Sequence, residues 1–386
     1  MNFDLTEEQQ ILVDSVAKFV QNDSNTERFR KLRDTERGLR YLVTDAETGE
    51  RVVEEKLDPS RLFLGGGVFY DRSQDFPIPL AGVNYFNYDW RGTGTQINAF
   101  LAGPLVTLDA ASPNLFGSRL TGGVDLFALA FAGTDSVFRG DREAEEEDVE
   151  VLRPNIDFTL GRPIGSFFKL DFEYSLGWVR FDEGDDTAAD FVVPTDHLQH
   201  SFTLTPRYNR NGYRLSAFGR HVVRSEWEPW GLPGSVGFDP EHESFSQWGA
   251  ALAKVWHLPK FQKIGAEIEY AGGENLDRFS KYQFGFFSDI RVHGYRSDRI
   301  RAEEAWAAHF SYGFELGQLF RLDLVGDAAR ATDDLARLEQ EFLAGVGIVG
   351  TVTGPWNTLF NVDVGVPVAG PDTGVSALIA VLKLFR

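Results

Sequence analysis

The chain has 386 residues, a formal net charge of −20 and no cysteine. The lack of cysteine excludes disulfides, thiolate metal sites and cysteine nucleophiles. The excess of acidic residues argues against a nucleic-acid partner, because binding to phosphates needs a basic face.

Residues 1–38 are predicted to be helical. Thr6 followed by Gln9 fits a capping box. The apolar residues that follow share one helical face: Ile11, Leu12, Val16, Phe19 and Val20. The opening MNFDLTEEQQ resembles the N-terminal segment of acyl-CoA dehydrogenases, but the flavin-binding sheet, C-terminal bundle and catalytic glutamate of that family have no counterpart afterwards. We interpret this fragment as a fused or mis-assembled start.

Residues 39–60 are interpreted as a short polar linker, compatible with a hairpin around Glu47–Gly49. An exported protein should open with a basic, then apolar, then small-residue signal. The chain opens on an acidic amphipathic segment instead. We therefore expect that the export signal is absent from the chain as given.

Runs of alternating polar and apolar residues extend from Arg61 to Arg386. In the clearest run, Ser166–Arg180, the apolar and the charged residues fall on opposite faces of an extended chain. Such runs reach about ten residues, whereas strands of soluble sheets average about 5–6. Ten residues cross a bilayer at a tilt, and no uncharged apolar run reaches the roughly 18 residues of a membrane helix. The pattern predicts an all-β transmembrane barrel with an apolar outside and a polar lumen.

We count sixteen strands in residues 61–386 and assign them to one antiparallel outer-membrane β-barrel domain, since an even number closes without free edges. They are centred on Leu62–Tyr70, Ile78–Trp90, Gln96–Leu108, Ser118–Ala132, Glu150–Leu160, Ser166–Arg180, Leu198–Tyr208, Tyr213–Arg224, Ser246–Trp256, Phe261–Ala271, Lys281–Phe287, Ala305–Leu316, Phe320–Ala329, Phe342–Val352, Leu359–Val368 and Val375–Phe385. The longest loop, near residues 287–304, separates the eleventh and twelfth strands. The acidic runs Asp141–Glu150 and Asp182–Asp186 are interpreted as solvated loop tips.

The longest loop contains Val292–His293–Gly294–Tyr295, and the strands after it carry Glu315, Asp327, Gly345–Val346–Gly347 and Asp363–Val364–Gly365. This order resembles the C-terminal half of the BamA/TamA family of outer-membrane assembly and export barrels, the bacterial surface antigen family. In that family a V-R-G-[FY] loop motif folds into the lumen, and its arginine pairs with acids on the next two strands. The resemblance covers Leu62–Arg386 and is specific over Val292–Gly365.

The resemblance implies a lumen latch, for which we expect His293, Gly294, Tyr295, Arg296, Glu315 and Asp327. Strand parity independently turns Glu315 and Asp327 inward. His293 stands where the family has arginine, so the cation is either protonated His293 or Arg296. We favour Arg296, which stays charged at every relevant pH. A histidine lacks the guanidinium fork, so a latch built on it would be weaker or pH-sensitive.

We expect a non-enzymatic barrel of the BamA/TamA type that takes part in insertion or export of proteins or lipids. Residues 39–60 are too few for even one of the family's docking modules, so a passive channel or structural barrel is the alternative. A lipid hydrolase is a remote alternative that rests on His309–Phe310–Ser311. Parity points both of these side chains to the lumen, and no asparagine follows that could orient the imidazole.

We expect no cofactor and no metal. His197 and His200 lie three residues apart on an extended segment and face opposite ways. The expected surroundings are the lipid bilayer and lipopolysaccharide of a Gram-negative outer membrane. The expected partners are client outer-membrane or exported proteins, with no nucleic acid, and the barrel is expected to be a monomer.

Overall fold

The computed structural model describes residues 40–44, 51–55, 59–70, 77–103, 105–130, 132–139, 142–234, 242–286, 288–296, 299–316, 320–333, 338–354, 358–371 and 374–385. The chain divides into two units, residues 1–59 and 60–386. In the first unit, β1 (Arg40–Thr44) and β2 (Arg51–Glu55) pair antiparallel, as expected for a hairpin between them. The predicted helical stub, with its resemblance to acyl-CoA dehydrogenases, lies outside the described residues.

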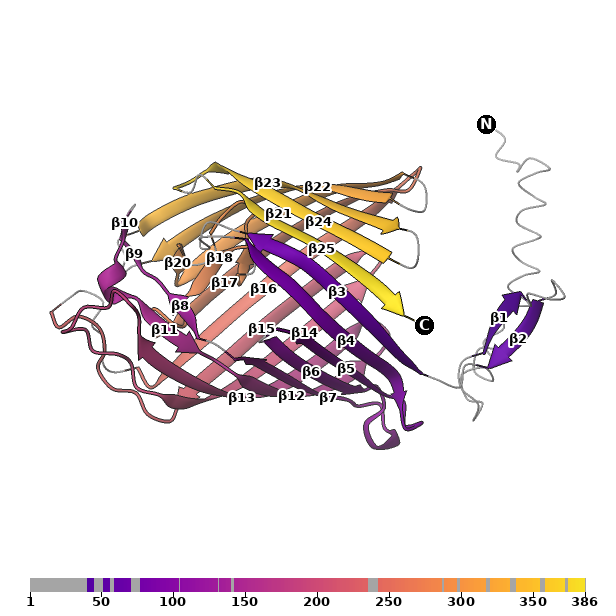
Figure 1. Ribbon diagram of the computed structural model, residues 1–386, viewed down its shortest axis with the longest axis horizontal. Coiled ribbons are helices and arrows are strands. Elements are labelled where there is room, and N and C mark those ends of the chain that lie inside the picture. Colours follow the sequence, from indigo (N-terminus) through magenta and orange to yellow (C-terminus); the bar gives the residue numbers. More distant parts are fainter. Residues whose placement is uncertain are drawn as a thin grey trace. The chain divides into compact units, whose positions relative to one another are not determined.

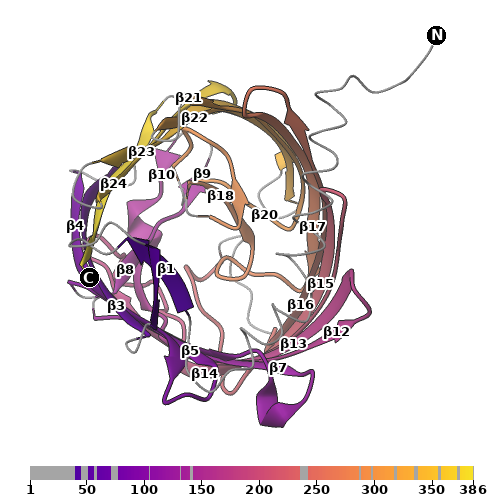
Figure 2. The same ribbon diagram turned by 90° about the vertical axis from the view of Figure 1, so that its right-hand side faces the viewer.

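In the described part of the second unit, sixteen antiparallel strands close into a barrel (Figures 1 and 2). They are β3 (Ser60–Tyr70), β4 (Ile78–Trp90), β5 (Thr95–Ala102), β6 (Leu105–Ser112), β7 (Thr121–Leu129), β12 (Asn155–Ile164), β13 (Phe168–Glu183), β14 (His197–Arg210), β15 (Tyr213–Arg224), β16 (Ser244–Leu258), β17 (Gln262–Glu274), β21 (Glu304–Leu316), β22 (Phe320–Asp333), β23 (Leu338–Gly354), β24 (Thr358–Ala369) and β25 (Ser376–Phe385). The last strand pairs with the first, from Ala377 opposite Tyr70 to Phe385 opposite Leu62. The ladder therefore has no open edge at this seam.

The predicted strand count is confirmed, although two of the predicted strands were wrong and their errors cancel. The predicted strand Gln96–Leu108 is two strands, β5 and β6, which turn at Gly103. The predicted strand Lys281–Phe287 is not in the wall. Its residues form β18 (Tyr282–Gly285), which belongs to a small three-stranded sheet with β19 (Ile290–Arg291) and β20 (Arg301–Ala302).

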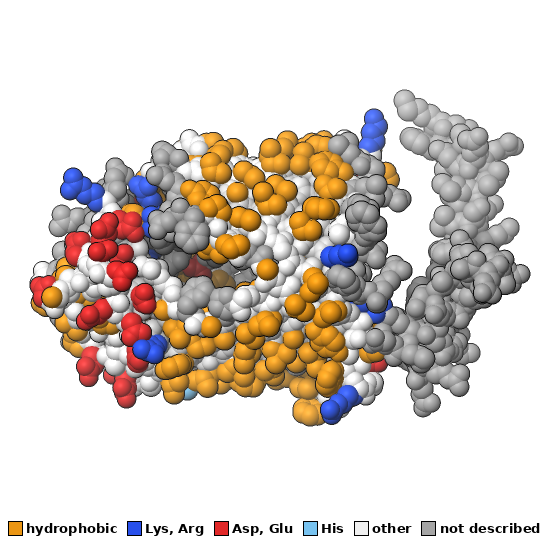
Figure 3. Space-filling view, viewed as in Figure 1, with side chains coloured by type: hydrophobic (Ala, Val, Ile, Leu, Met, Phe, Trp, Pro, Cys, Tyr) orange, Lys and Arg blue, Asp and Glu red, His pale blue; other side chains and the backbone are white. Residues whose placement is uncertain are grey.

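The outer face of the barrel wall is apolar. Many large apolar side chains on it are more than 40% exposed, among them Phe172, Leu252, Ile268, Trp306 and Phe310. Figure 3 shows hydrophobic side chains spread over the wall and acidic side chains gathered at one end. Side chains of opposite parity, such as Asp171 and Asp327, are buried on the inner side. The distribution is the reverse of a soluble domain and fits a wall that faces lipid.

The two ends of the barrel differ. At one end the strands are joined by short turns, for example Asn211–Gly212, whose φ angles are 51° and 76°. At the other end lie the long loops, which carry β8 (Gly133–Asp135), β9 (Phe138–Arg139), β10 (Arg142–Glu143), η2 (Glu145–Glu147) and β11 (Val149–Leu152). A three-residue turn, η1 (Leu115–Gly117), lies at the short-turn end. In the described residues no helix is both long and apolar enough to span a membrane.

The long loops are packed into a cover at their end of the barrel. Apolar residues of these loops are buried against Val179 and Phe181 of β13: Val149, Phe191, Trp227 and Trp230. The Arg278 side chain, in the loop after β17, donates to Asp135 Oδ1 at 2.6 Å and to the Glu147 carbonyl at 2.7 Å. The interpretation of the acidic runs as solvated tips holds for Asp185 and Asp186, which are exposed. It was wrong for Glu147, whose side chain the cover buries.

Candidate functional site: a loop folded into the barrel

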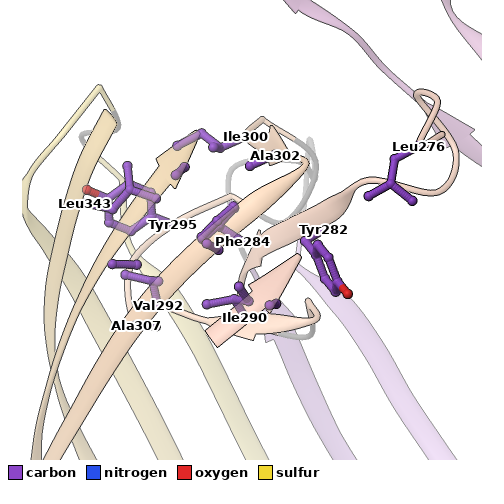
Figure 4. Packing of buried hydrophobic residues seen from close by; sticks show 14 of the residues in the cluster. Leu276, Tyr282, Phe284, Ile290, Val292, Tyr295, Ile300, Ala302, Ala307 and Leu343 are labelled. Atoms are coloured by element: carbon purple, nitrogen blue, oxygen red, sulfur yellow. The ribbon is translucent and has the colours of Figure 1, made fainter. Parts of the chain in front are cut away.

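The loop between β17 and β21 folds inward, and Figure 2 shows β18 and β20 inside the ring of strands. Its apolar side chains form a buried cluster with the wall: Leu276, Tyr282, Phe284, Ile290, Val292, Tyr295 and Ile300 from the loop, with Ala305, Ala307, Ala329, Ala331 and Leu343 from β21, β22 and β23 (Figure 4). Alanines on the inner wall leave room for the larger loop residues. Each buried large side chain contributes about 1.5–3 kcal/mol, so these apolar contacts help to hold the loop against the inner wall.

Glycines in β23 and β24 form a slot for His293. A Cβ at Gly347 would lie 2.6 Å from the His293 ring, and one at Gly365 would lie 2.6 Å from the His293 Cβ. A Cβ at Gly345 would meet the His293 carbonyl. The next residue, Gly294, has φ +85° and its backbone lies against Val366 and Pro367. A residue with a Cβ is disfavoured in that conformation, which explains glycine at this point of the loop.

His293 is bound to Asp327 of β22 in this slot. The His293 amide donates to Asp327 Oδ2 at 3.0 Å, and the ring Nδ1 contacts the same oxygen. The two residues are only 3% and 7% exposed. The pairing is thus removed from bulk water, where an ion pair contributes most if its charges are balanced and costs most if they are not.

Four further charged groups extend this pair into a network. Arg291 contacts Asp363 of β24, whose Oδ1 lies 3.4 Å from His293 Nε2. On the other side of Asp327, His309 of β21 bonds through Nδ1 to Asp327 Oδ1 at 2.8 Å. The second nitrogen of His309 lies 2.9 Å from Glu269 Oε1 of β17. We call these six residues the latch network: Glu269, Arg291, His293, His309, Asp327 and Asp363. It joins the loop to four strands of the wall.

The surroundings of His293 favour its charged form. Burial alone would lower its pKa. The hydrogen bonds to Asp327 and Asp363 outweigh burial, so the pKa of His293 is raised above its ordinary value. The network borders a lumen cavity of about 430 Å³, which His309 also lines.

The residues beside His293 fix the loop to the closing strands. The Gly294 amide donates to Ser376 Oγ of β25 at 3.0 Å, and Ser376 is fully buried. The Tyr295 hydroxyl donates to the Ala369 carbonyl and accepts the Ala344 amide at 3.3 Å. The loop therefore touches β22, β23, β24 and β25, the four strands that precede the seam with β3.

Two of the expected latch residues are placed elsewhere. Arg296, which we favoured as the cation, pairs with Glu143 of β10 at 3.1 Å and stacks on Phe138, because the chain turns toward the cover after Tyr295. Glu315 lies six residues along β21 from His309, about 20 Å at the rise of a strand, and is exposed beside the short turns. The preference for Arg296 and the assignment of Glu315 were therefore wrong. The network uses His293 and Asp363 in their place.

Three residues of the latch network were not predicted from the sequence: Glu269, Arg291 and Asp363. His309 was predicted to face the lumen but not to belong to the network. Parity would have turned each of the strand residues inward, but nothing in the sequence shows which inward residues share one level of the barrel. Glycines at 345, 347 and 365 were noted only as part of a motif order. Gly345 and Gly347 are two residues apart and share one face of β23, and glycines placed in this way signal a backbone or ring lying against the inner wall.

The arrangement offers no support for the hydrolase alternative. Both ring nitrogens of His309 face carboxylates, so neither is aimed at the Ser311 hydroxyl. His197 Nδ1 lies 2.9 Å from the Thr195 carbonyl and His200 Nδ1 lies 2.9 Å from the Tyr174 hydroxyl, so the two do not converge. In the described ranges no group of three His, Asp or Glu residues is arranged to hold a metal ion.

Comparison with known proteins gives likenesses in structure. The fold matches BamA from Haemophilus ducreyi lacking POTRA domains 1–3, with a TM-score of 0.58, 13% identity, and coverage of 94% of this chain and 79% of that one. It matches CdiB from Escherichia coli with a TM-score of 0.62, 11% identity, and coverage of 93% and 69%. It matches CdiB from Acinetobacter baumannii with a TM-score of 0.55, 7% identity, and coverage of 90% and 65%.

No family model and no curated protein matches the sequence, so nothing among these matches supports the acyl-CoA dehydrogenase resemblance of residues 1–38. At 7–13% identity, the structural likenesses show the fold alone. That fold is a sixteen-stranded barrel of the kind found in BamA and CdiB.

Proposed function

We propose that this protein is a non-enzymatic outer-membrane barrel of the BamA/TamA type, which takes part in inserting or exporting proteins or lipids. The observation that carries the proposal is the loop Ile290–Tyr295, which docks on the inner face of β22–β25 through His293 and Asp327. Sixteen-stranded porins keep a water-filled channel, whereas here a loop fitted against glycines lies inside the lumen. The likeness to BamA and CdiB supports the same reading at the level of the fold.

The proposed location is a Gram-negative outer membrane. The apolar outer face needs lipid around it, and the BamA and CdiB folds support an outer membrane. Outer-membrane barrels place short turns in the periplasm and long loops outside, which puts the cover at the cell surface. The proposed surroundings are phospholipid and lipopolysaccharide, with client proteins as partners and a monomeric barrel.

The cover argues against the alternative function, a passive channel. Arg278 ties the loop after β17 to Asp135 and to η2, and Arg224 binds Asp277 at 2.6 Å under the same loops. Both pairs are almost fully buried. An open pore would need these contacts to part.

The test reconstitutes the full chain, folded from denaturant, into liposomes and planar bilayers. Faster folding of an added test barrel than in empty liposomes, together with small and flickering conductance, is expected. A steady, large, ion-selective conductance with no effect on the test barrel would contradict the proposal and favour the channel.

A further inference from the structure

His309 is held between two acids from different strands. Its Nδ1 lies 2.8 Å from Asp327 Oδ1 of β22, and its Nε2 lies 2.9 Å from Glu269 Oε1 of β17. A neutral imidazole has one N–H and one lone pair. A neutral His309 would therefore turn its lone pair toward a carboxylate. The contacts are satisfied together only when both nitrogens of His309 carry a proton.

His293 does not share this constraint. Its Nδ1 faces Asp327, but its Nε2 lies 3.3 Å from Arg291 Nη2 as well as 3.4 Å from Asp363 Oδ1. Arg291 is always a donor, so His293 can stay in place either neutral or charged. The proton that the geometry requires is thus on His309.

We propose that His309 is a proton-dependent switch for the docked loop. Its imidazolium holds Asp327 in position, and Asp327 holds the loop through the amide and ring of His293. Without that proton, Asp327 and Glu269 face a single remaining N–H of His309. Either the partly exposed Glu269 loses its bond to His309, or the buried Asp327 keeps only its bonds to His293. The loop is then docked at lower pH and released as the pH rises.

The other charged groups near His309 do not replace its proton. Glu267, opposite His309 in the β17–β21 register, is a third acid on this wall and leans toward Arg214 at 3.8 Å. Arg291 is engaged by Asp363, and Asp363 lies beyond His293. His309 is 23% exposed in its side chain and lines the lumen cavity, so protons reach it from water.

The docking of the loop, rather than the insertion of a client protein, is the quantity that tests this switch. Hydrogen exchange measured by mass spectrometry follows the amides of His293 and Gly294, which the docked loop protects through Asp327 and Ser376. The full-length barrel is compared in lipid nanodiscs at about pH 6 and about pH 9, on either side of the ordinary range of histidine. A peptide from β14 serves as the internal reference and corrects for the intrinsic pH dependence of exchange.

We expect the protection of these amides to fall about tenfold or more at the higher pH, since each unit of separation between the docked and free pKa is a factor of ten, while the β14 peptide keeps its protection. His309→Gln, which cannot become a cation, should leave the loop weakly protected at both values. His309→Lys, which stays charged, should keep it protected at both. Equal protection of the wild-type loop at both pH values overturns the proposal, and so does a pH-dependent fall that persists in His309→Gln.

Discussion

The backbone amide and the ring Nδ1 of His293 both meet one oxygen of Asp327, so a single carboxylate holds the loop by two donors. A backbone bond fixes the position of the chain, whereas a ring bond fixes the side chain. Together they set the register between a loop and a strand that are separated by 34 residues in sequence. This relationship makes Asp327 the residue on which the first prediction rests.

Asp327→Ala should destabilise the folded barrel by about 3–5 kcal/mol, because it leaves buried cations without their partner. The measurement is the temperature at which the folded protein stops migrating as a compact band on a gel. Asp182→Ala is the matched control. Asp182 pairs with Arg180, but the side chains are 49% and 48% exposed, so its loss should cost less than about 1 kcal/mol. If Asp327→Ala and the wild type lose the compact band at the same temperature, the latch network does not stabilise the barrel.

Gly365→Ala should displace the loop. The added Cβ would lie 2.6 Å from the His293 Cβ and 2.8 Å from the Gly294 amide nitrogen. Overpacking of this kind costs about 1–3 kcal/mol, and the loop is the part that can move. Gly326→Ala is the control on β22, two strands away, because its Cβ would come no closer than 4.0 Å to another atom. Limited proteolysis should cut the loop in the first variant and spare it in the second, and cleavage of both at the same rate speaks against the slot.

Arg278→Ala should open the cover and raise the conductance of the barrel severalfold in planar bilayers. The variant removes the bonds to Asp135 and to the Glu147 carbonyl, both almost fully buried. Arg180→Ala, which removes an exposed arginine near the same rim, is expected to behave as wild type. A closed barrel after Arg278→Ala would show that the apolar residues of the cover suffice.

The partly buried carboxyl of Asp148, which lies outside the wall strands, should make the stability of the fold depend on pH. Burial raises the pKa of Asp148 to about 6, against a partial opposing effect of the hydrogen bond from Ser136. A carboxyl whose folded pKa is raised favours folding at low pH, and that contribution is lost as the pH rises from about 3.8 through about 6. Asp148→Asn should therefore raise the unfolding temperature at about pH 8 but not below about pH 4. An unchanged difference at both pH values would exclude Asp148 as the cause.

The wall was predictable because alternation reports directly on lipid and lumen faces, and β4 and β15 were predicted with their observed ends. The two strand errors have local causes. The turn at Gly103 is short and lies within the apolar run Phe100–Val106, so the sequence shows no polar break between β5 and β6. Tyr282–Gly285 alternates because it packs on the inner wall, where a buried loop strand has the same pattern as a wall strand.

The candidate site was predictable only where the chain carries a local motif. His293, Gly294, Tyr295 and Asp327 come together as the motif implied. The partners from β17 and β21 could not be found, since the level of a side chain in the barrel depends on strand stagger. Arg296 was misplaced because a loop residue has no parity, and its direction is set by the cover that it reaches.

We propose that the docked loop serves assisted insertion. The folding rate of a test outer-membrane barrel in liposomes that hold Gly365→Ala or Gly326→Ala tests this role. The two variants differ in whether the new methyl group reaches His293. We predict that Gly326→Ala accelerates folding as wild type does, whereas Gly365→Ala loses most of the acceleration while remaining a compact band on gels. Equal acceleration by both variants, with the loop shown to be displaced in Gly365→Ala, would contradict the account.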